Sequence, residues 1–136
     1  MIYKSFDYKK LVKSFGHAID GVVFLLSNEQ NARIHSIITI MVGVLAYVLQ
    51  VSRIEAAVLF MAVILVFAIE IINTAVEKTF DLLHPEDHDV IRGVKDAMAG
   101  AVLISAIIAV VVATLIFIPH LKSLLVANVA LGADLI

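Results

Sequence analysis

The sequence predicts an all-α integral membrane protein that consists of an N-terminal amphipathic helix and three transmembrane helices. Of its 136 residues, 62% are hydrophobic and 16% are charged, and the mean hydropathy is +1.04. A soluble domain is typically about 45–50% apolar and about 25% charged. Three apolar runs, at residues 36–51, 54–69 and 97–118, approach or reach the ~20 residues that a transmembrane helix needs. Lipid is therefore expected to be the main solvent of this chain.

The composition also excludes several function classes. The chain has no cysteine, so it forms no disulfide, thiolate metal site or cysteine nucleophile. Its formal net charge of -2 provides no general attraction for nucleic acid. It contains neither a Walker phosphate-binding loop nor a GxGxxG turn, which excludes a kinase of the soluble type.

The segment before the first apolar run, residues 6–30, is expected to form a surface helix. Apolar residues recur at helical spacing from Leu11 to Leu26, and polar residues that include Lys10, Lys13 and His17 fall on the opposite side. An amphipathic helix with lysines on its polar side commonly lies in the membrane interface. The alternative is that the apolar side packs on other protein in the same plane.

The three spans are expected at residues 34–51, 53–83 and 95–118, followed by a tail at 119–136, and together they make one domain over 1–136. Ser52 and Glu55 have the spacing of a capping box, which predicts a helix start near Arg53. Pro85 predicts a helix end near His84. The second helix would then be about 45 Å long at ~1.5 Å per residue, longer than the ~30 Å hydrocarbon core, so one end must protrude.

The distribution of basic residues predicts which side each end of the chain occupies. With three spans, two of the ten lysines and arginines lie on one side, Arg53 and Lys122, and the other eight lie on the opposite side. The side richer in lysine and arginine is normally cytoplasmic. We therefore expect a multi-pass protein of the cell (inner) membrane whose N-terminus and 79–95 loop are cytoplasmic.

Polar residues interrupt the second span toward its cytoplasmic end and form one stripe along the helix: Glu70, Asn73, Thr74, Glu77 and Asp81. Glu70 is expected near the inner boundary of the hydrocarbon core, with Glu77 about 10 Å further toward the cytoplasm. Ionisable residues within a span are costly and usually mark function. The alternative is a structural stripe that hydrogen-bonds neighbouring helices or holds an oligomer together.

Further charged residues at the starts of the other spans are expected at the same level of the membrane: Glu29, Arg33, His35, Lys95 and Asp96. Carboxylates from two helices are suitable ligands for Mg²⁺ carried by a nucleotide, and a lysine neutralises phosphate charge. A carboxylate at headgroup depth can accept the proton of a lipid hydroxyl as it attacks a γ-phosphate. The pattern predicts a lipid kinase, and its rival is a non-enzymatic small helical membrane subunit whose stripe only binds a partner.

Two further features have less specific interpretations. The loop around Pro85 contains Glu86, Asp87 and His88, which suggests contact with the nucleotide more than a metal site of its own. In the third span, small residues recur every four positions from Ala97 to Ala113, a spacing that lets helices approach closely in lipid. The alternative is that these are ordinary alanines of an apolar helix. Because three spans cannot easily enclose both a lipid and a nucleotide, an oligomer with sites between its subunits is expected.

At this point the sequence resembles the small prokaryotic diacylglycerol kinase family, which includes the undecaprenol kinases. The resemblance extends from about Gly16 to Pro119 and rests on Asn28-Glu29, on Glu70-Ile71-Ile72-Asn73-Thr74-Ala75-Val76-Glu77 with Asp81, and on Lys95-Asp96 followed by 99–103. The stretches Ala32-Arg33-Ile34-His35, 99–103 and Ile116-Phe117-Ile118-Pro119 are more similar to the undecaprenol kinase branch. Residues 120–136 have no counterpart in this resemblance.

The resemblance implies a homotrimeric kinase that transfers phosphate from ATP to undecaprenol, or alternatively to diacylglycerol. It implies that Glu70 is the catalytic base, with Asn73 beside it in the lipid site, and that Glu29 and Glu77 coordinate Mg²⁺ on ATP. The implied ATP-contacting positions are Lys10, His17, Glu29, Glu77, Glu86, Asp87, His88, Lys95 and Asp96. The chain departs from the diacylglycerol enzymes at Lys10, where they have arginine, and at His17, where they have an aromatic residue.

Overall fold

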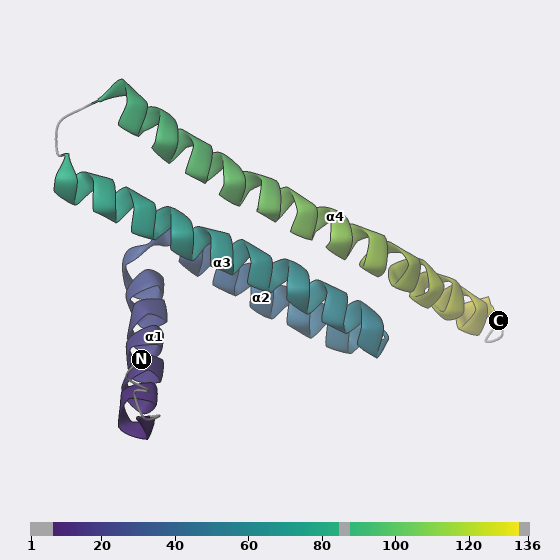
Figure 1. Cartoon of the computed structure of the whole chain (residues 1–136). Coiled ribbons are helices and arrows are strands. Elements are labelled where there is room, and N and C mark those ends of the chain that lie inside the picture. The colour runs from purple at the N-terminus through teal and green to yellow at the C-terminus, as the bar shows by residue number, and fades with distance from the viewer. Residues whose placement is uncertain (1–6, 85–87, 134–136) are drawn as a thin grey trace, which may run out of the picture.

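The computed structural model describes residues 7–84 and 88–133, with side chains described up to residue 126. In this part of the chain four helices follow one another: α1 (Tyr8–Asn28), α2 (Gln30–Val48), α3 (Arg53–Leu83) and α4 (Asp89–Ala133). Figure 1 shows α2, α3 and α4 running side by side, with α1 directed across them. The three long helices are each long and apolar enough to cross a membrane, which confirms the predicted all-helical class and the three candidate spans.

The predicted start and end of α3 are confirmed at the level of single hydrogen bonds. The Glu55 backbone N–H donates to Ser52 Oγ at 3.3 Å, and the Ser52 N–H donates to Glu55 Oε2 at 2.7 Å. Both halves of the capping box are therefore formed, so two of the otherwise unpaired donors at the helix start are satisfied. At the other end α3 stops at Leu83, and His84 before Pro85 is no longer helical.

Few side chains of the bundle are buried within the single chain. The largest apolar cluster, Leu49, Leu59 and Phe117, lies near the α2–α3 turn, which we call the hairpin end of the bundle. The opposite end, around Glu70 to Lys95, we call the acidic end. Large apolar side chains over the rest of α2, α3 and α4 are exposed, as expected of helices whose outer solvent is hydrocarbon.

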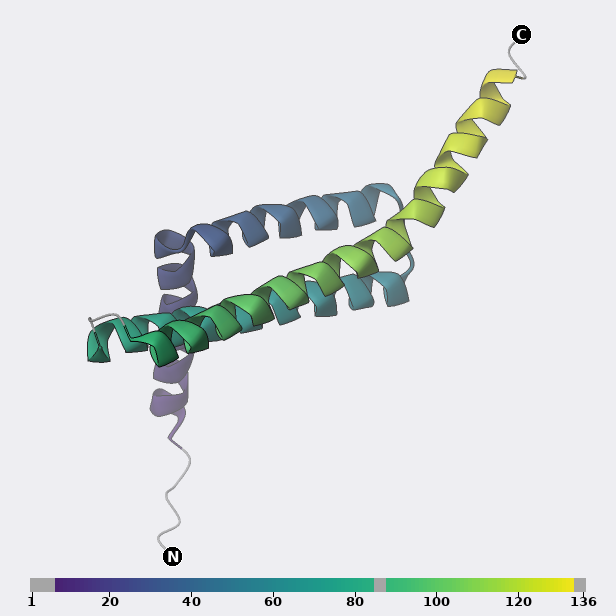
Figure 2. The ribbon, with the colours of Figure 1, turned by 90° about the horizontal axis from the view of Figure 1, so that it is seen from above.

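Helix α4 is longer at both ends than the segment expected to span the membrane, 95–118. It begins at Asp89 and continues through Pro119 to Ala133, so most of the expected tail is helical. A proline within a helix removes one backbone hydrogen bond and bends the helix, and Figure 2 shows the C-terminal part of α4 turning away from the bundle. His120 Nδ1 lies 2.9 Å from the Ile116 carbonyl oxygen, which gives a carbonyl near the bend a side-chain partner.

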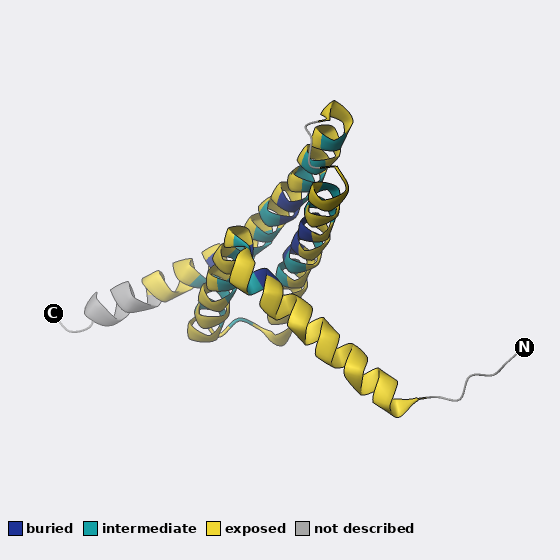
Figure 3. Cartoon of the chain, turned by 90° about the vertical axis from the view of Figure 1, so that its left-hand side faces the viewer, coloured by how far each residue is buried: buried dark blue, intermediate teal, exposed yellow. Residues whose placement is uncertain are grey.

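Helix α1 is helical as expected, and it is almost entirely exposed. Asp7 caps it by accepting hydrogen bonds from the backbone N–H groups of Lys9 and Lys10. Leu25, in its last two turns, is its one buried residue, and Figure 3 shows nearly all the rest of the helix exposed beside the bundle. Its placement in the membrane interface stays a prediction.

Candidate functional site

Glu70 is the most unusual residue of the bundle, because it is a carboxylate with only 1% of its surface exposed. Its Oε2 atom has no hydrogen-bond partner among the described residues, and neither has Oδ1 of Asn73, one turn further along α3. A buried polar atom without a partner costs about 1–3 kcal/mol and is rare in folded proteins. These two atoms therefore indicate a partner from outside the single chain, which is an ordered water, a ligand or a second subunit.

The polar stripe on α3 becomes steadily more exposed along the helix. Glu70, Asn73 and Thr74 are buried, Glu77 is half-buried, and Asp81 is exposed. The stripe thus passes from a protected setting to an open one over about three turns. This is the arrangement that a reaction between a buried lipid hydroxyl and a water-soluble phosphate donor needs.

Glu29 lies at the break between α1 and α2 and is the one residue there that is not helical, with φ -107° and ψ 125°. Its backbone N–H donates to the Leu25 carbonyl at 2.9 Å and so closes α1. Its side chain makes no capping bond to α2. Instead the carboxylate reaches α3, where Lys78 Nζ lies 3.1 Å from Glu29 Oε1.

The fold brings Glu29, Glu70 and Glu77 into one cluster, although the first is far from the other two in sequence. The negative charges of Glu77 and Glu29 both act on Glu70, and both also act on Lys78. This convergence agrees with the sequence-based expectation that carboxylates from separate helices share one level of the bundle.

The cluster supplies only part of the coordination shell of a magnesium ion, and waters or the phosphates of a nucleotide must complete it. Within residues 7–84 and 88–126, no group of three or more histidine, aspartate or glutamate side chains has the geometry to hold a metal ion. Mg²⁺ typically takes one or two protein carboxylates and completes its shell with waters and substrate phosphates. Glu29 and Glu77 supply that number of carboxylates, so the donor set fits a metal delivered with a nucleotide.

Lys95 lies at the start of the apolar part of α4 and pairs with Asp81 of α3. The pair joins the two helices at the acidic end, and it leaves the Lys95 side chain about one-third exposed. Asp96, next along α4, is exposed. A lysine held at this level is well placed to meet an anionic group that approaches the cluster.

The remaining predicted nucleotide contacts are less closely gathered. His88 is at the start of α4, where its Nδ1 accepts the Val90 backbone N–H at 3.3 Å and its carbonyl accepts the Arg92 N–H at 3.0 Å. Glu86 and Asp87 lie outside the described residues. Lys10 and His17 are exposed on α1, which leads away from the bundle, so within one chain they do not join the cluster. Their contact with ATP stays a prediction.

Lys78 is not among the site residues predicted from the sequence. There it counts only as one of the eight basic residues on the expected cytoplasmic side. The signal was present in the spacing: Lys78 follows Thr74 by four residues and precedes Asp81 by three. These intervals place all three side chains on one helix face. A lysine within an acidic stripe is a candidate for the site on the same grounds as the acids around it.

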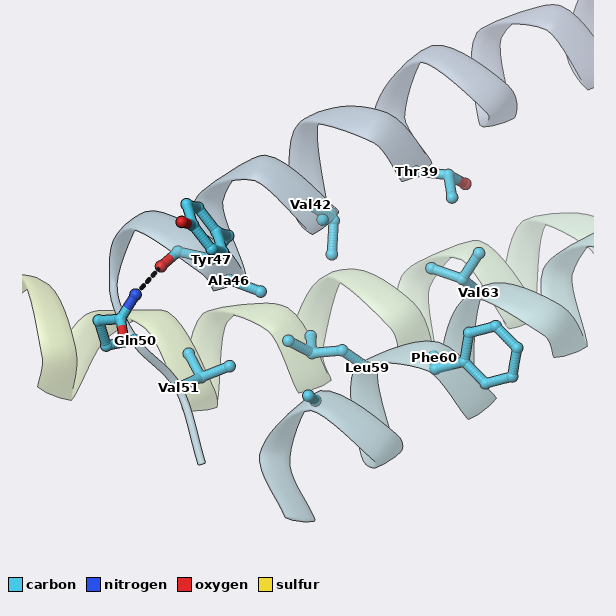
Figure 4. Close-up of a pocket in the computed structure, with 11 residues that line it drawn as sticks. Thr39, Val42, Ala46, Tyr47, Gln50, Val51, Leu59, Phe60 and Val63 are labelled. Carbon is cyan, nitrogen blue, oxygen red and sulfur yellow. Dashed lines mark hydrogen bonds between the residues drawn. The ribbon is translucent and has the colours of Figure 1, made fainter. Parts of the chain in front are cut away.

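An apolar cavity lies away from these residues. It is a crevice of about 470 Å³ between α2 and α3 at the hairpin end, lined by Val42, Ala46, Leu59 and Val63 among others. Figure 4 shows these side chains facing one another across the crevice, with Gln50 Nε2 donating to the Tyr47 carbonyl at its mouth. None of the acidic-end residues lines it, so it is no part of the chemical site.

The chain is similar in sequence to known proteins. Residues 16–117 match the family described as prokaryotic diacylglycerol kinase. The chain is 33% identical to an undecaprenol kinase of Bacillus subtilis over 85% of its own length and 94% of that protein. It is 38% identical to a diacylglycerol kinase of Synechocystis over 85% of its own length and 67% of that protein. A diacylglycerol kinase of Escherichia coli is 31% identical over 76% of this chain and 85% of its own.

Proposed function

Because this chain belongs to the prokaryotic diacylglycerol kinase family and is thus a membrane lipid kinase, we propose that it transfers the γ-phosphate of ATP to undecaprenol. The observation that carries the proposal is Glu70, a buried carboxylate in a candidate span with an oxygen that no described residue satisfies. A lipid hydroxyl is a donor that could satisfy it.

Glu70 is the proposed catalytic base. Its carboxylate accepts the proton of the lipid hydroxyl as the oxygen attacks the γ-phosphorus, and the bond from that phosphorus to the β–γ bridging oxygen breaks. Asn73, buried one turn away, has an unpaired side-chain oxygen that can accept a further hydrogen bond from the lipid headgroup. Burial of both groups excludes water, which would otherwise compete with the lipid as the acceptor.

Glu29 and Glu77 are the proposed ligands of the nucleotide's magnesium ion. Both offer carboxylate oxygens at the more exposed side of Glu70, where phosphates arrive from water. The bound ion would neutralise charge on the phosphates, which is the main requirement of phosphoryl transfer. Lys95 and Asp96, with His88 and the neighbouring Glu86 and Asp87, complete the proposed nucleotide site.

Undecaprenol is proposed over diacylglycerol on two grounds. The match to the Bacillus undecaprenol kinase extends over 94% of that protein, and the stretches at 32–35, 99–103 and 116–119 resemble that branch. The Synechocystis diacylglycerol kinase, at 38% identity, makes diacylglycerol the alternative acceptor. The two acceptors differ in the hydrocarbon attached to the alcohol and share the chemistry of the hydroxyl.

The test is a side-by-side assay of the purified chain in detergent with Mg-ATP and either alcohol. We expect a higher kcat/KM for undecaprenol. A higher kcat/KM for diacylglycerol would make diacylglycerol the substrate, and the kinase activity would stand. Phosphorylation of neither alcohol would contradict the proposed lipid substrates altogether.

We further propose that the functional unit is a homotrimer with its N-terminus and 79–95 loop on the cytoplasmic side of the cell membrane. The unpaired oxygens of Glu70 and Asn73 and the exposed α1 support an assembly in which neighbouring chains complete each site. The mass of the detergent-solubilised protein, corrected for bound detergent, tests the trimer. Labelling of single cysteines introduced at His84 and at Ser123, in intact and opened cells, tests the sidedness.

A further inference from the structure

Lys78 is the one lysine that contacts a proposed metal ligand in the described structure. Its Nζ lies 3.1 Å from Oε1 of Glu29, and the two side chains come from different elements, α3 and the α1–α2 break. Glu77, the second proposed ligand, is its neighbour in sequence, and its charge also acts on Lys78. The ammonium thus lies beside one oxygen that a metal ion would use and is also attracted by the second proposed ligand.

A carboxylate oxygen cannot serve an ammonium and a divalent cation equally at the same time. The carboxylate group has about four lone-pair sites, but two cations held on it repel each other, and the metal ion carries twice the charge of the ammonium. The Lys78 side chain is 51% exposed, whereas that of Glu29 is 21% exposed. A half-exposed ion pair is worth only about 0–1 kcal/mol, so Lys78 can be displaced at small cost, and its flexible four-carbon stem lets it move.

The displaced ammonium has few other acceptors nearby. Asp81, one turn further along α3, also attracts Lys78, but it already pairs with Lys95, and Glu77 would itself be engaged by the metal. The phosphate oxygens that arrive with the metal are the remaining strong acceptors. Lysine is a common phosphate ligand that acts as a point charge.

Resting on the proposed function above, we propose that Lys78 is an exchangeable counter-ion of the metal site. Its ammonium holds Glu29 while the site has no metal, and it transfers to a phosphate oxygen when Mg-ATP takes Glu29 over. No bond other than hydrogen bonds and ion pairs changes in this step.

The proposal predicts effects of opposite sign on two ligands. Lys78→Gln removes the competitor, so Mn²⁺ without nucleotide should bind about two- to fivefold more tightly than to the wild-type chain. The same variant lacks the phosphate partner, so Mg-ATP should bind about two- to fivefold more weakly. Lys78→Arg keeps a cation at the position and should leave both affinities close to those of the wild type.

Both affinities are measured on the full-length protein in one detergent, Mn²⁺ by electron paramagnetic resonance of the free ion and Mg-ATP by calorimetry. Lys122→Gln removes one exposed lysine charge from the C-terminal part of α4 and is the matched control, for which neither affinity should change. Glu29→Gln should weaken Mn²⁺ binding and so identifies the site that is observed. Equal oligomeric mass of all variants excludes misfolding.

Weaker binding of Mn²⁺ to Lys78→Gln would overturn the proposal and make Lys78 a residue that only positions Glu29. Unchanged affinity for either ligand would overturn it as well, as would failure of the wild-type chain to bind Mn²⁺. Because both readouts are binding measurements, they do not depend on which alcohol is phosphorylated. A chain that phosphorylates neither alcohol would therefore refute the proposed function without deciding the role of Lys78.

Discussion

Glu55 and Glu70 lie on the same helix, α3, and differ in almost every other respect. Glu55, at the hairpin end, accepts the Ser52 backbone N–H at 2.7 Å, and the same oxygen lies 3.6 Å from His120 Nε2. Glu70, at the acidic end, is 1% exposed, and one of its oxygens has no partner among the described residues. The Glu55 carboxylate is hydrogen-bonded within its own chain, whereas the Glu70 carboxylate has an oxygen free to bind a further partner.

The difference shows that one membrane helix can carry an acid that caps its own backbone and, further along, an acid without a partner in its own chain. A capping carboxylate lies where the helix leaves four donors unpaired, so its hydrogen bonds stabilise the fold itself. A carboxylate in the interior of a helix meets no such donors, because each backbone N–H around it is bonded within the helix. Its burial without a partner is a cost to stability that only an external partner can offset.

The largest effect on turnover is expected from Glu70→Gln. The amide cannot accept a proton from the lipid hydroxyl, so turnover should fall by roughly 10²–10⁴-fold, as is typical for loss of a general base. Mg-ATP affinity should change little, and added Mg²⁺ should not restore turnover. Turnover and Mg-ATP binding are measured in the same detergent.

Glu55→Gln is the matched control for that experiment, because glutamine also serves in a capping box. It should retain nearly full turnover. If Glu70→Gln instead abolished Mg-ATP binding, a metal-binding or structural role would replace its assignment as the base.

The second effect is expected from the two proposed metal ligands. Glu29→Gln and Glu77→Gln each remove an anionic oxygen from the ion, and loss of a direct ligand should cost at least the ~10–100-fold in metal affinity that loss of an outer-shell partner typically costs. Raised Mg²⁺ should recover part of the activity, in contrast to Glu70→Gln. Activity is measured over a Mg²⁺ titration, and a loss that is independent of Mg²⁺ would contradict the assignment.

A smaller effect is expected from Lys95→Ala, because this lysine is partly exposed and already paired with Asp81. Loss of a charge-assisted contact to phosphate should raise the Michaelis constant for ATP by about three- to tenfold. The Michaelis constant for the lipid should change less, since a neutral alcohol gains little from an ammonium. An altered lipid dependence with an unchanged ATP dependence would remove Lys95 from the nucleotide site.

The smallest effect on activity is expected at the hairpin end. Ser52→Ala removes the side chain that caps α3 and should lower stability by about 1 kcal/mol. Turnover below the unfolding temperature should stay unchanged, because no residue of the acidic end is touched. Thermal unfolding in detergent with a parallel activity assay tests this, and a loss of turnover in the folded variant would break the proposed division between the two ends.

The sequence alone was sufficient for those features that depend on neighbours within about four residues or on composition. Ser52 and Glu55 predicted the start of α3, Pro85 predicted its end, and the spacing from Glu70 to Asp81 predicted one polar stripe. The apolar runs predicted three candidate spans, and the acidic motif indicated the family. Helical geometry is local and regular, so such patterns determine these elements before any tertiary contact forms.

Only the tertiary structure decided which charged groups meet across helices. The pairing of Lys78 with Glu29 and of Lys95 with Asp81 depends on how far one helix is shifted along another, and no local pattern sets that shift. The same holds for the unpaired oxygens of Glu70 and Asn73, since burial is a property of the whole bundle. The passage of α4 through Pro119 was likewise hidden from sequence, because proline disfavours a helix interior without forbidding it.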